Sequence, residues 1–253
     1  MSTEQLTTKD YFQKPAVQAK FKELLGAKST QFMTSVMQIT SNNALLSKAS
    51  PESIYGAAIT AAILDLPIQN NLGFAYIVPY GGAAQFQIGY KGLIQLALRS
   101  GQFKNISACE IYEGQIISEN PLTGYVFDFS KKTSEKVVGY AAYFSLINGF
   151  EKTEYMSIQQ LEAHGKKFSQ TYKKGFGVWA DDFSSMAKKT VLKLTLSKYA
   201  PLSVEMQKAV IFDQATTTDG ENIEYCDNIE VIEPTPEQQA AAEKIGAMFD
   251  GQK

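Results

Sequence analysis

A basic and aromatic segment, residues 166–179, contains the residue types that bind single-stranded nucleic acid. It reads KKFSQTYKKGFGVW and alternates paired lysines with aromatic side chains. Lysines attract phosphates, and aromatic faces stack on unpaired bases. The alternative is a solvated surface loop whose aromatic side chains turn into the core. The candidate binding residues that this charge argument gives are Lys166, Lys167, Lys173 and Lys174.

A second group of lysines follows on the helix that we expect over residues 178–199: Lys188, Lys189, Lys193 and Lys198. At 100° per residue, Lys189 and Lys193 lie about 40° apart around the helix axis, while Lys198 points elsewhere. Such a stripe is often only a solvated helix face. Its position directly after the basic and aromatic segment favours a binding role.

The charge of the chain is unevenly distributed. Residues 213–253 carry ten acidic and two basic residues, so their net charge is −8 and that of residues 1–212 is +6. A basic body with an acidic tail is typical of a polyanion-binding core joined to an interaction segment. Arg99 is the only arginine among 24 basic residues. Because arginine dominates base-specific contacts, this usage favours binding of the phosphate backbone with little sequence preference.

Several kinds of catalytic site are disfavoured by the residues present. His164 is the only histidine, and Cys109 and Cys226 form no CxxC arrangement, so zinc cages and Ser-His-Asp triads cannot be assembled within one chain. The segment Gly89-Tyr90-Lys91-Gly92 lacks the spacing of an ATP-binding P-loop. These residues therefore disfavour histidine- or zinc-based catalysis and an ATP-binding P-loop.

Two other classes of function stay open. A metal-dependent nuclease needs clustered carboxylates, and the expected strands carry Asp128, Glu135, Glu151 and Glu154, which solvated strand faces explain equally. Such a nuclease would shorten DNA when Mg²⁺ is present. A structural protein that binds no DNA would show no salt-dependent binding at all.

Helices and strands must position these residues. The helix signals are Pro15 to Gly26, a run through Phe32 and Ile39, Ser50-Pro51 up to Pro67, and Tyr90 to Gly101. Alternation around Gly81-Gly82 predicts a β-hairpin. Further strands are expected over Ile106–Tyr112, Gln115–Ser118, Tyr125–Phe129, Val137–Ile147 and Phe150–Met156.

The two faces of the hairpin are hard to assign. One face carries Phe74, Tyr76, Val78 and Tyr80, and we expect most of these to be buried, although they could also form a stacking platform for bases. Gln85 and Gln87 alternate with apolar residues and are expected to be the exposed pair.

The C-terminal half is expected to continue with a capping box at Ser157 and Gln160, a loop over 165–177, a long helix over 178–199 and a short one over 204–212. The fold class is α+β: a helical N-terminal lobe, a β-hairpin plus an antiparallel strand meander, a long basic C-terminal helix and a flexible acidic tail. We expect residues 1–212 to form the core and residues 213–253 a mostly disordered tail. The chain has no transmembrane stretch and no apolar signal region, which predicts a cytoplasmic protein.

Several ordered motifs resemble the RecT family of phage single-strand annealing proteins. They are Gln87-Ile88-Gly89-Tyr90-Lys91-Gly92-Leu93-Ile94-Gln95-Leu96-Ala97, Trp179 with Asp182-Phe183, Met186 to Lys193, Leu196 to Ser203, Gly139-Tyr140-Ala141 and Thr153 to Ser157. The similarity spans roughly residues 15–212. The acidic tail falls outside it.

The resemblance implies an ATP-independent recombinase of a phage or prophage, acting in the bacterial cytoplasm without covalent catalysis, a cofactor or a metal. Such proteins coat single-stranded DNA, anneal complementary strands into duplex, and form homo-oligomeric rings or helical filaments. They usually act with a 5′→3′ exonuclease. The acidic tail could recruit that exonuclease or a host single-strand-binding protein, could mimic DNA to limit binding, or could only aid solubility. The groove for DNA is expected between the helical N-terminal lobe and the part with the strands and the long helix.

Carried over residue by residue, the resemblance assigns DNA binding to Lys91 and Arg99 from the first motif, and to Trp179, Lys188, Lys189, Lys193 and Lys198 from the later ones. The lysines of 166–174 are added from the charge argument. Joint reversal of Lys189 and Lys193 to glutamate is expected to abolish annealing and to leave the fold intact. Truncation after Phe212 is expected to leave annealing of naked DNA intact or improve it.

Overall fold

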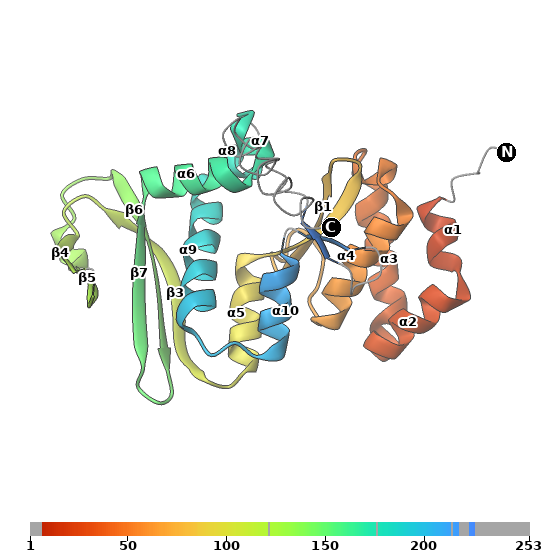
Figure 1. Ribbon diagram of the computed structural model, residues 1–253, viewed down its shortest axis with the longest axis horizontal. Helices are drawn as coiled ribbons and strands as arrows, with labels where there is room; N and C mark the ends of the chain where they lie inside the picture. Colours follow the sequence, from red (N-terminus) through yellow and green to blue (C-terminus); the bar gives the residue numbers. More distant parts are fainter. Residues whose placement is uncertain (1–6, 121, 176, 214, 218–222, 226–253) are drawn as a thin grey trace, which may run out of the picture.

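The computed structural model describes residues 7–120, 122–175, 177–213, 215–217 and 223–225, and it shows a mixed α+β architecture with N-terminal helices and antiparallel sheets. Helices form one end of the molecule and a three-stranded sheet the other (Figure 1). Two helices, α5 (Tyr90–Arg99) and α10 (Val204–Phe212), lie between the two ends. None of the described helices is long and apolar enough to cross a membrane.

The N-terminal lobe follows the start signals predicted at Pro15 and Ser50-Pro51, and it adds a helix after Thr7 that was not predicted. Thr7 and Ser50 cap two of its helices through their side chains, and proline occupies the first position of two. The rings of Phe12, Phe21 and Tyr55 pack together and join the helices. The helices are α1 (Thr8–Gln13), α2 (Pro15–Leu25), α3 (Ser29–Ser41) and α4 (Pro51–Ile63), with short 3₁₀ turns η1 (Gly26–Lys28) and η2 (Leu46–Lys48).

The predicted hairpin is present as β1 (Ala75–Tyr80) and β2 (Ala83–Ile88), but its faces were assigned wrongly from sequence. Ala75 and Ile77 point into the core opposite Ile88 and Phe86, whereas the Tyr76 face is only half-buried. Gln85, expected to be exposed, is only 1% exposed. The reason is that neither face of the hairpin is open to solvent. Helix α4 packs on the hairpin, and on the other side Gln85 faces a cavity that residues of the segment 168–179 also line.

The glycines of the first family motif lie where two stretches of backbone approach each other closely. A Cβ atom at Gly89 would lie 2.1 Å from the carbonyl oxygen of Gly73, and one at Gly92 would lie 2.1 Å from that of Phe74. Real Cβ atoms do not approach so closely, so only glycine lets α5 cross the chain that enters β1. The motif thus locks α5 onto the hairpin.

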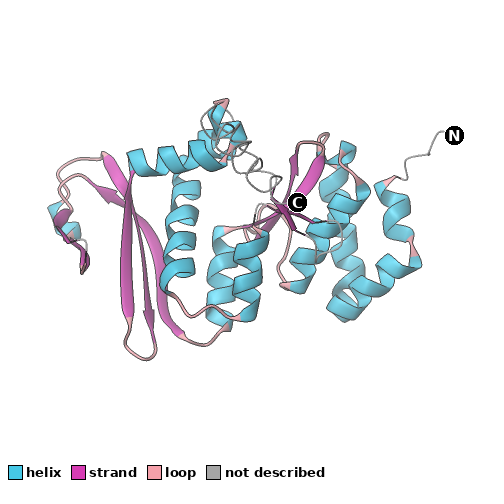
Figure 2. Ribbon diagram, in the orientation of Figure 1, coloured by secondary structure: helices cyan, strands magenta, loops and turns pink. Residues whose placement is uncertain are grey.

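The sheet at the other end has the strand order β3-β6-β7, built from β3 (Phe103–Tyr112), β6 (Val137–Leu146) and β7 (Glu151–Ser157). It is antiparallel throughout. The expected meander is interrupted, because β4 (Ile116–Asn120) and β5 (Gly124–Phe127) pair only with each other. They form a hairpin at the far end of the molecule, followed by η3 (Phe129–Lys131) (Figure 2).

The C-terminal helices differ from the sequence prediction in two places. The loop expected over 165–177 is largely helical, because α6 (Ile158–Phe168), which starts at the predicted capping box, extends into it as far as Phe168 and α7 (Gln170–Lys173) follows. The long helix is broken into α8 (Val178–Asp181) and α9 (Phe183–Tyr199), because the Asp182 side chain caps the second helix at the Ser185 amide. Helix α9 packs against all three strands of the sheet.

The chain continues past α10 into two short paired strands, β8 (Ala215–Thr217) and β9 (Ile223–Tyr225). β8 lies against β2 and α4. Residues 214, 218–222 and 226–253 of the acidic segment, for which disorder is expected from sequence, lie outside the described residues.

Candidate nucleic-acid interface

The lysines of α6 and α7 form an exposed basic surface. Lys166, Lys167, Lys173 and Lys174 are all exposed. Lys166 lies 3.7 Å from Glu162, a solvent-exposed pair of little energetic weight. In the described part of the chain, no carboxylate pairs with the other three. These side chains are therefore available to an external polyanion, and they are called the α6–α7 basic surface below.

Trp179 is buried and acts as the anchor of this surface. Only 5% of the residue is exposed, and its ring contacts those of Tyr172 and Phe183 at centroid distances of 5.6 Å. A Cβ atom at Gly165 would lie 3.1 Å from the indole, so α6 also packs tightly on it. Trp179 thus holds α7 and α8 against α6 and α9. Because Trp179 is buried, a ligand can reach its indole only from within a cavity that it lines.

Two lysines of α9 turn inward and meet an aspartate that sequence reasoning placed in the tail. Lys189 Nζ lies 3.4 Å from Asp213 Oδ1, and Lys193 Nζ lies 2.5 Å from Asp213 Oδ2. The side chain of Asp213 is 1% exposed. Its Oδ1 also accepts a 3.0 Å hydrogen bond from the Ile88 amide of β2. This cluster joins α9, β2 and the end of α10.

The electrostatics of the cluster favour an ionised Asp213. Burial alone would raise the pKa of the Asp213 carboxyl, but the ammonium groups of Lys189 and Lys193 and the Ile88 amide outweigh it and hold that pKa below its usual value. Burial lowers the pKa of the Lys189 ammonium, and Asp213 offsets this only in part. Asp213 therefore belongs electrostatically to the core, and the boundary expected after residue 212 falls inside this cluster.

The other lysines of α9 differ in availability. Lys188 lies 3.2 Å from Glu110 of β3, which also accepts a 2.6 Å hydrogen bond from the Ser184 hydroxyl. The Ser184 bond is the main reason that the pKa of Glu110 is lowered, and Lys188 adds to it. Lys198 is exposed near the Tyr199 ring. Of the four α9 lysines predicted to bind DNA, Lys198 is thus the one that faces solvent without a carboxylate partner among the described residues.

Lys91 and Arg99 stand at opposite ends of α5. Lys91 is exposed, and the methylenes of its side chain lie near Gly73. Arg99 donates to the carbonyl oxygens of Leu64 at 2.6 Å and Asp65 at 2.7 Å, and it also lies 3.8 Å from the Asp65 carboxylate. Asp65 has a left-handed φ of 45°, so Arg99 secures a strained turn after α4.

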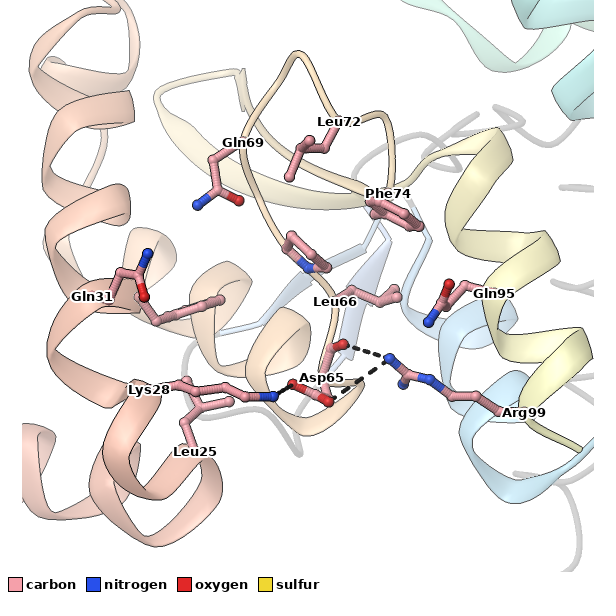
Figure 3. Close-up of a pocket in the computed structure, with 12 residues that line it drawn as sticks. Leu25, Lys28, Gln31, Asp65, Leu66, Gln69, Leu72, Phe74, Gln95 and Arg99 are labelled. Carbon is pink, nitrogen blue, oxygen red and sulfur yellow. Dashed lines mark hydrogen bonds and ion pairs between the residues drawn. The ribbon is translucent and has the colours of Figure 1, made fainter.

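This turn forms one wall of a cavity of about 410 Å³ between α3 and α5 (Figure 3). Lys28 lies 3.6 Å from Asp65 on the side opposite Arg99, so the carboxylate is shared between two cations. Gln31, Gln69 and Gln95 add amide groups to the walls, and Gln69 donates to Ser35. The guanidinium of Arg99 is therefore engaged with the protein itself.

The candidate residues thus fall into distinct places. The α6–α7 lysines form one surface, Lys189 and Lys193 pair with Asp213 in a cluster that lines a cavity together with Trp179, Lys188 lies beside the sheet, and Arg99 lines the separate cavity. The role of Asp213 was not predicted from the sequence, because no residue near it indicates a contact with Lys189, 24 positions earlier in the chain. Among the described residues, no group of three or more His, Cys, Asp or Glu side chains is arranged to hold a metal ion, the strand-region carboxylates included.

Comparison with known sequences places the chain in a class of recombination proteins. The sequence model of the RecT family matches residues 30–226, which includes Asp213, and the chain belongs to this family. Over 250 residues it is 48% identical to the "Uncharacterized protein YqaK" of Bacillus subtilis strain 168, covering 97% of this chain and 87% of that protein. Over 178 residues it is 31% identical to "Protein RecT" of Escherichia coli K12, covering 64% of this chain and 62% of that protein. Membership implies single-stranded DNA binding and a non-catalytic role in single-strand annealing recombination.

Proposed function

We propose that this protein binds single-stranded DNA without ATP and anneals complementary strands while assembled as an oligomer on the DNA. The observation that best supports this proposal is the α6–α7 basic surface, whose lysines are exposed while Lys189 and Lys193 of α9 are held by Asp213. Membership of the RecT family supports it independently.

The physical task of such a protein is to bring two polyanions together. Lysines that contact phosphates release condensed counterions, so binding strengthens as the salt concentration falls. If the strand is held by its backbone, its bases stay available to pair with a second strand. Watson–Crick pairing then tests complementarity, and the protein needs no sequence preference of its own.

We further propose a homo-oligomeric ring or helical filament, because linking many weak backbone contacts along one strand multiplies their effect. A 5′→3′ exonuclease is the expected source of the single strand. The acidic segment beyond residue 225, outside the described residues, is the proposed contact for that exonuclease or for a host single-strand-binding protein. We place this activity in the bacterial cytoplasm.

The proposal is tested with two complementary oligonucleotides, each labelled with one member of a fluorescence energy-transfer pair, mixed without ATP across a salt series. The expected result is faster duplex formation by the protein, with an acceleration that weakens as salt rises. No acceleration at any salt would contradict annealing. A parallel arm with Mg²⁺ is analysed on denaturing gels: intact strands support annealing, and shortened strands would favour the alternative of a metal-dependent nuclease.

A further inference from the structure

A small cavity lies between the β1–β2 hairpin and the α6–α8 segment. Its volume is about 240 Å³, below the roughly 300–1,000 Å³ typical of sites for drug-sized ligands. It therefore suits a group about as large as one heterocycle. Phe168 and Trp179 contribute aromatic walls, and Pro79 and Val178 contribute apolar ones.

Gln85 contributes an unusual polar group to this cavity. The residue is 1% exposed, and its Nε2 atom is buried without any hydrogen-bond partner in the described structure. Buried amide donors in folded proteins are nearly always paired, because leaving one unpaired costs the full desolvation of the group. A buried, unpaired amide that lines a cavity is therefore a feature that a bound ligand would satisfy.

Exposed lysines lie close in the chain to residues that line this cavity. Ser169 and Thr171 line the cavity and belong to the same segment as Lys167 and Lys173 of the α6–α7 basic surface. Val178, which also lines the cavity, is 61% exposed, so the cavity borders solvent there. An aromatic and amide pocket beside exposed lysines matches the three parts of a nucleotide-binding site: a face for stacking, an edge for hydrogen bonding and charge for the phosphate.

We propose that this cavity holds one unstacked nucleobase of the bound single strand, with the Gln85 carboxamide donating to the edge of the base. This inference rests on the proposed single-stranded DNA binding and adds a specific base site to it. Every base carries a hydrogen-bond acceptor on its edge, so an amide donor anchors a base without selecting a sequence. The site thus adds stacking and hydrogen-bond contacts to binding that backbone contacts alone supply only through charge.

The protein carries its own reporter for this site, because Trp179 is its single tryptophan and lines the cavity. Wild-type protein is titrated with an oligothymidine and with an abasic strand of the same length, while DNA anisotropy measures binding and Trp179 emission measures occupancy. We expect the thymidine strand to bind about tenfold more tightly and to quench Trp179, and the abasic strand to bind without quenching. Equal affinity and equal emission change for both strands would overturn the base site.

The variant Gln85→Met keeps the size of the side chain and removes its amide. We expect it to fold as well as wild type, to lose most of the preference for thymidine over abasic strands, and to keep the salt dependence of binding. The matched control is Gln95→Met in the separate cavity beside α5, which should retain the full preference. An undiminished preference in Gln85→Met, or an equal loss in both variants, would contradict the assignment. Failure of both strands to bind at any salt would instead contradict the proposed function itself.

Discussion

Lys189 and Asp213 form an ion pair inside the core, with Nζ and Oδ1 3.4 Å apart, although 24 positions separate them in the chain. Because Asp213 also accepts from Lys193 and from the Ile88 amide, one carboxylate ties the basic helix α9 to the hairpin. Two lysines that look like part of a solvated, DNA-binding stripe therefore have a structural partner.

Replacing Asp213 by asparagine should destabilise the protein by about 3 kcal/mol, because it leaves the buried Lys189 ammonium without a neutralising charge. Chemical denaturation followed by circular dichroism measures this. The control is Glu162→Gln, which removes an exposed pair with Lys166 and should cost less than about 1 kcal/mol. Equal stability of Asp213→Asn and wild type would show that the cluster is energetically unimportant.

The same geometry changes the expectation for the double reversal of Lys189 and Lys193 to glutamate. That variant would place two new carboxylates beside Asp213 in a buried site, so we expect it to unfold. Loss of annealing in it would carry no information about DNA contacts. A folded double variant, with a native denaturation midpoint, would contradict this reasoning.

Truncation should separate the core from the acidic segment. A chain that ends after Tyr225 should keep the stability of the full protein, whereas one that ends after Phe212 should lose at least as much stability as Asp213→Asn, because it lacks Asp213 and β8. Thermal denaturation of both truncations checks this. Equal melting temperatures for the two would mean that Asp213 and β8 do not stabilise the core.

His164 should make stability depend on pH in the mildly acidic range. Burial lowers the pKa of its imidazole below the ordinary value of 6.5, and the charges of Lys193 and Lys167 add to this. Below pH 6.5 the unfolded chain therefore binds a proton at His164 more readily than the folded protein does. His164 leaves the free energy of unfolding unchanged above pH 6.5 and lowers it as the pH falls below that value. The carboxyl groups with lowered pKa, such as Asp213, affect the stability only at lower pH.

Urea denaturation at pH 7.5 and pH 5.5 checks the role of His164. Between these two pH values, wild type should lose more free energy of unfolding than His164→Gln. The same loss in both proteins would contradict this role.

Gly92→Ala should destabilise the junction of α5 and the hairpin by about 1–3 kcal/mol, because its Cβ would meet the Phe74 carbonyl oxygen and force the backbones apart. Leu98→Ala, at a position of the same helix that is 52% exposed, is the control and should change stability far less. The denaturant midpoints of Gly92→Ala and Leu98→Ala, each compared with that of wild type, measure the two losses of stability. A stable Gly92→Ala protein would mean that the backbones separate at little cost.

Local signals in the sequence predicted most of the elements. Ser50-Pro51, Gly81-Gly82 and the capping box at Ser157 all act within a few residues, and each stands where it was predicted. The errors arose where tertiary contacts decide. Gln85 alternates with apolar neighbours as an exposed strand residue would, yet a second layer covers its face.

The candidate site was only partly readable for the same reason. The basic and aromatic character of 166–179 follows from composition, but the turning of Trp179 inward and of the lysines outward depends on how α7 and α8 pack. Likewise Lys189 and Lys193 could not be separated from Lys198 without knowing that Asp213 returns to α9.

The central claim, that the α6–α7 basic surface carries single-stranded DNA during annealing, is tested most directly by Lys173→Glu with Lys174→Glu. The matched control is Lys20→Glu with Lys22→Glu on α2, which makes the same change in net charge in the N-terminal helical end of the molecule, away from α7. At low salt the α7 variant should anneal about tenfold more slowly than wild type, and its binding should show a log–log salt slope shallower by about 0.7 for each lost phosphate contact, whereas the control should retain the wild-type slope. An α7 variant that anneals at the wild-type rate with an unchanged salt slope would contradict the account.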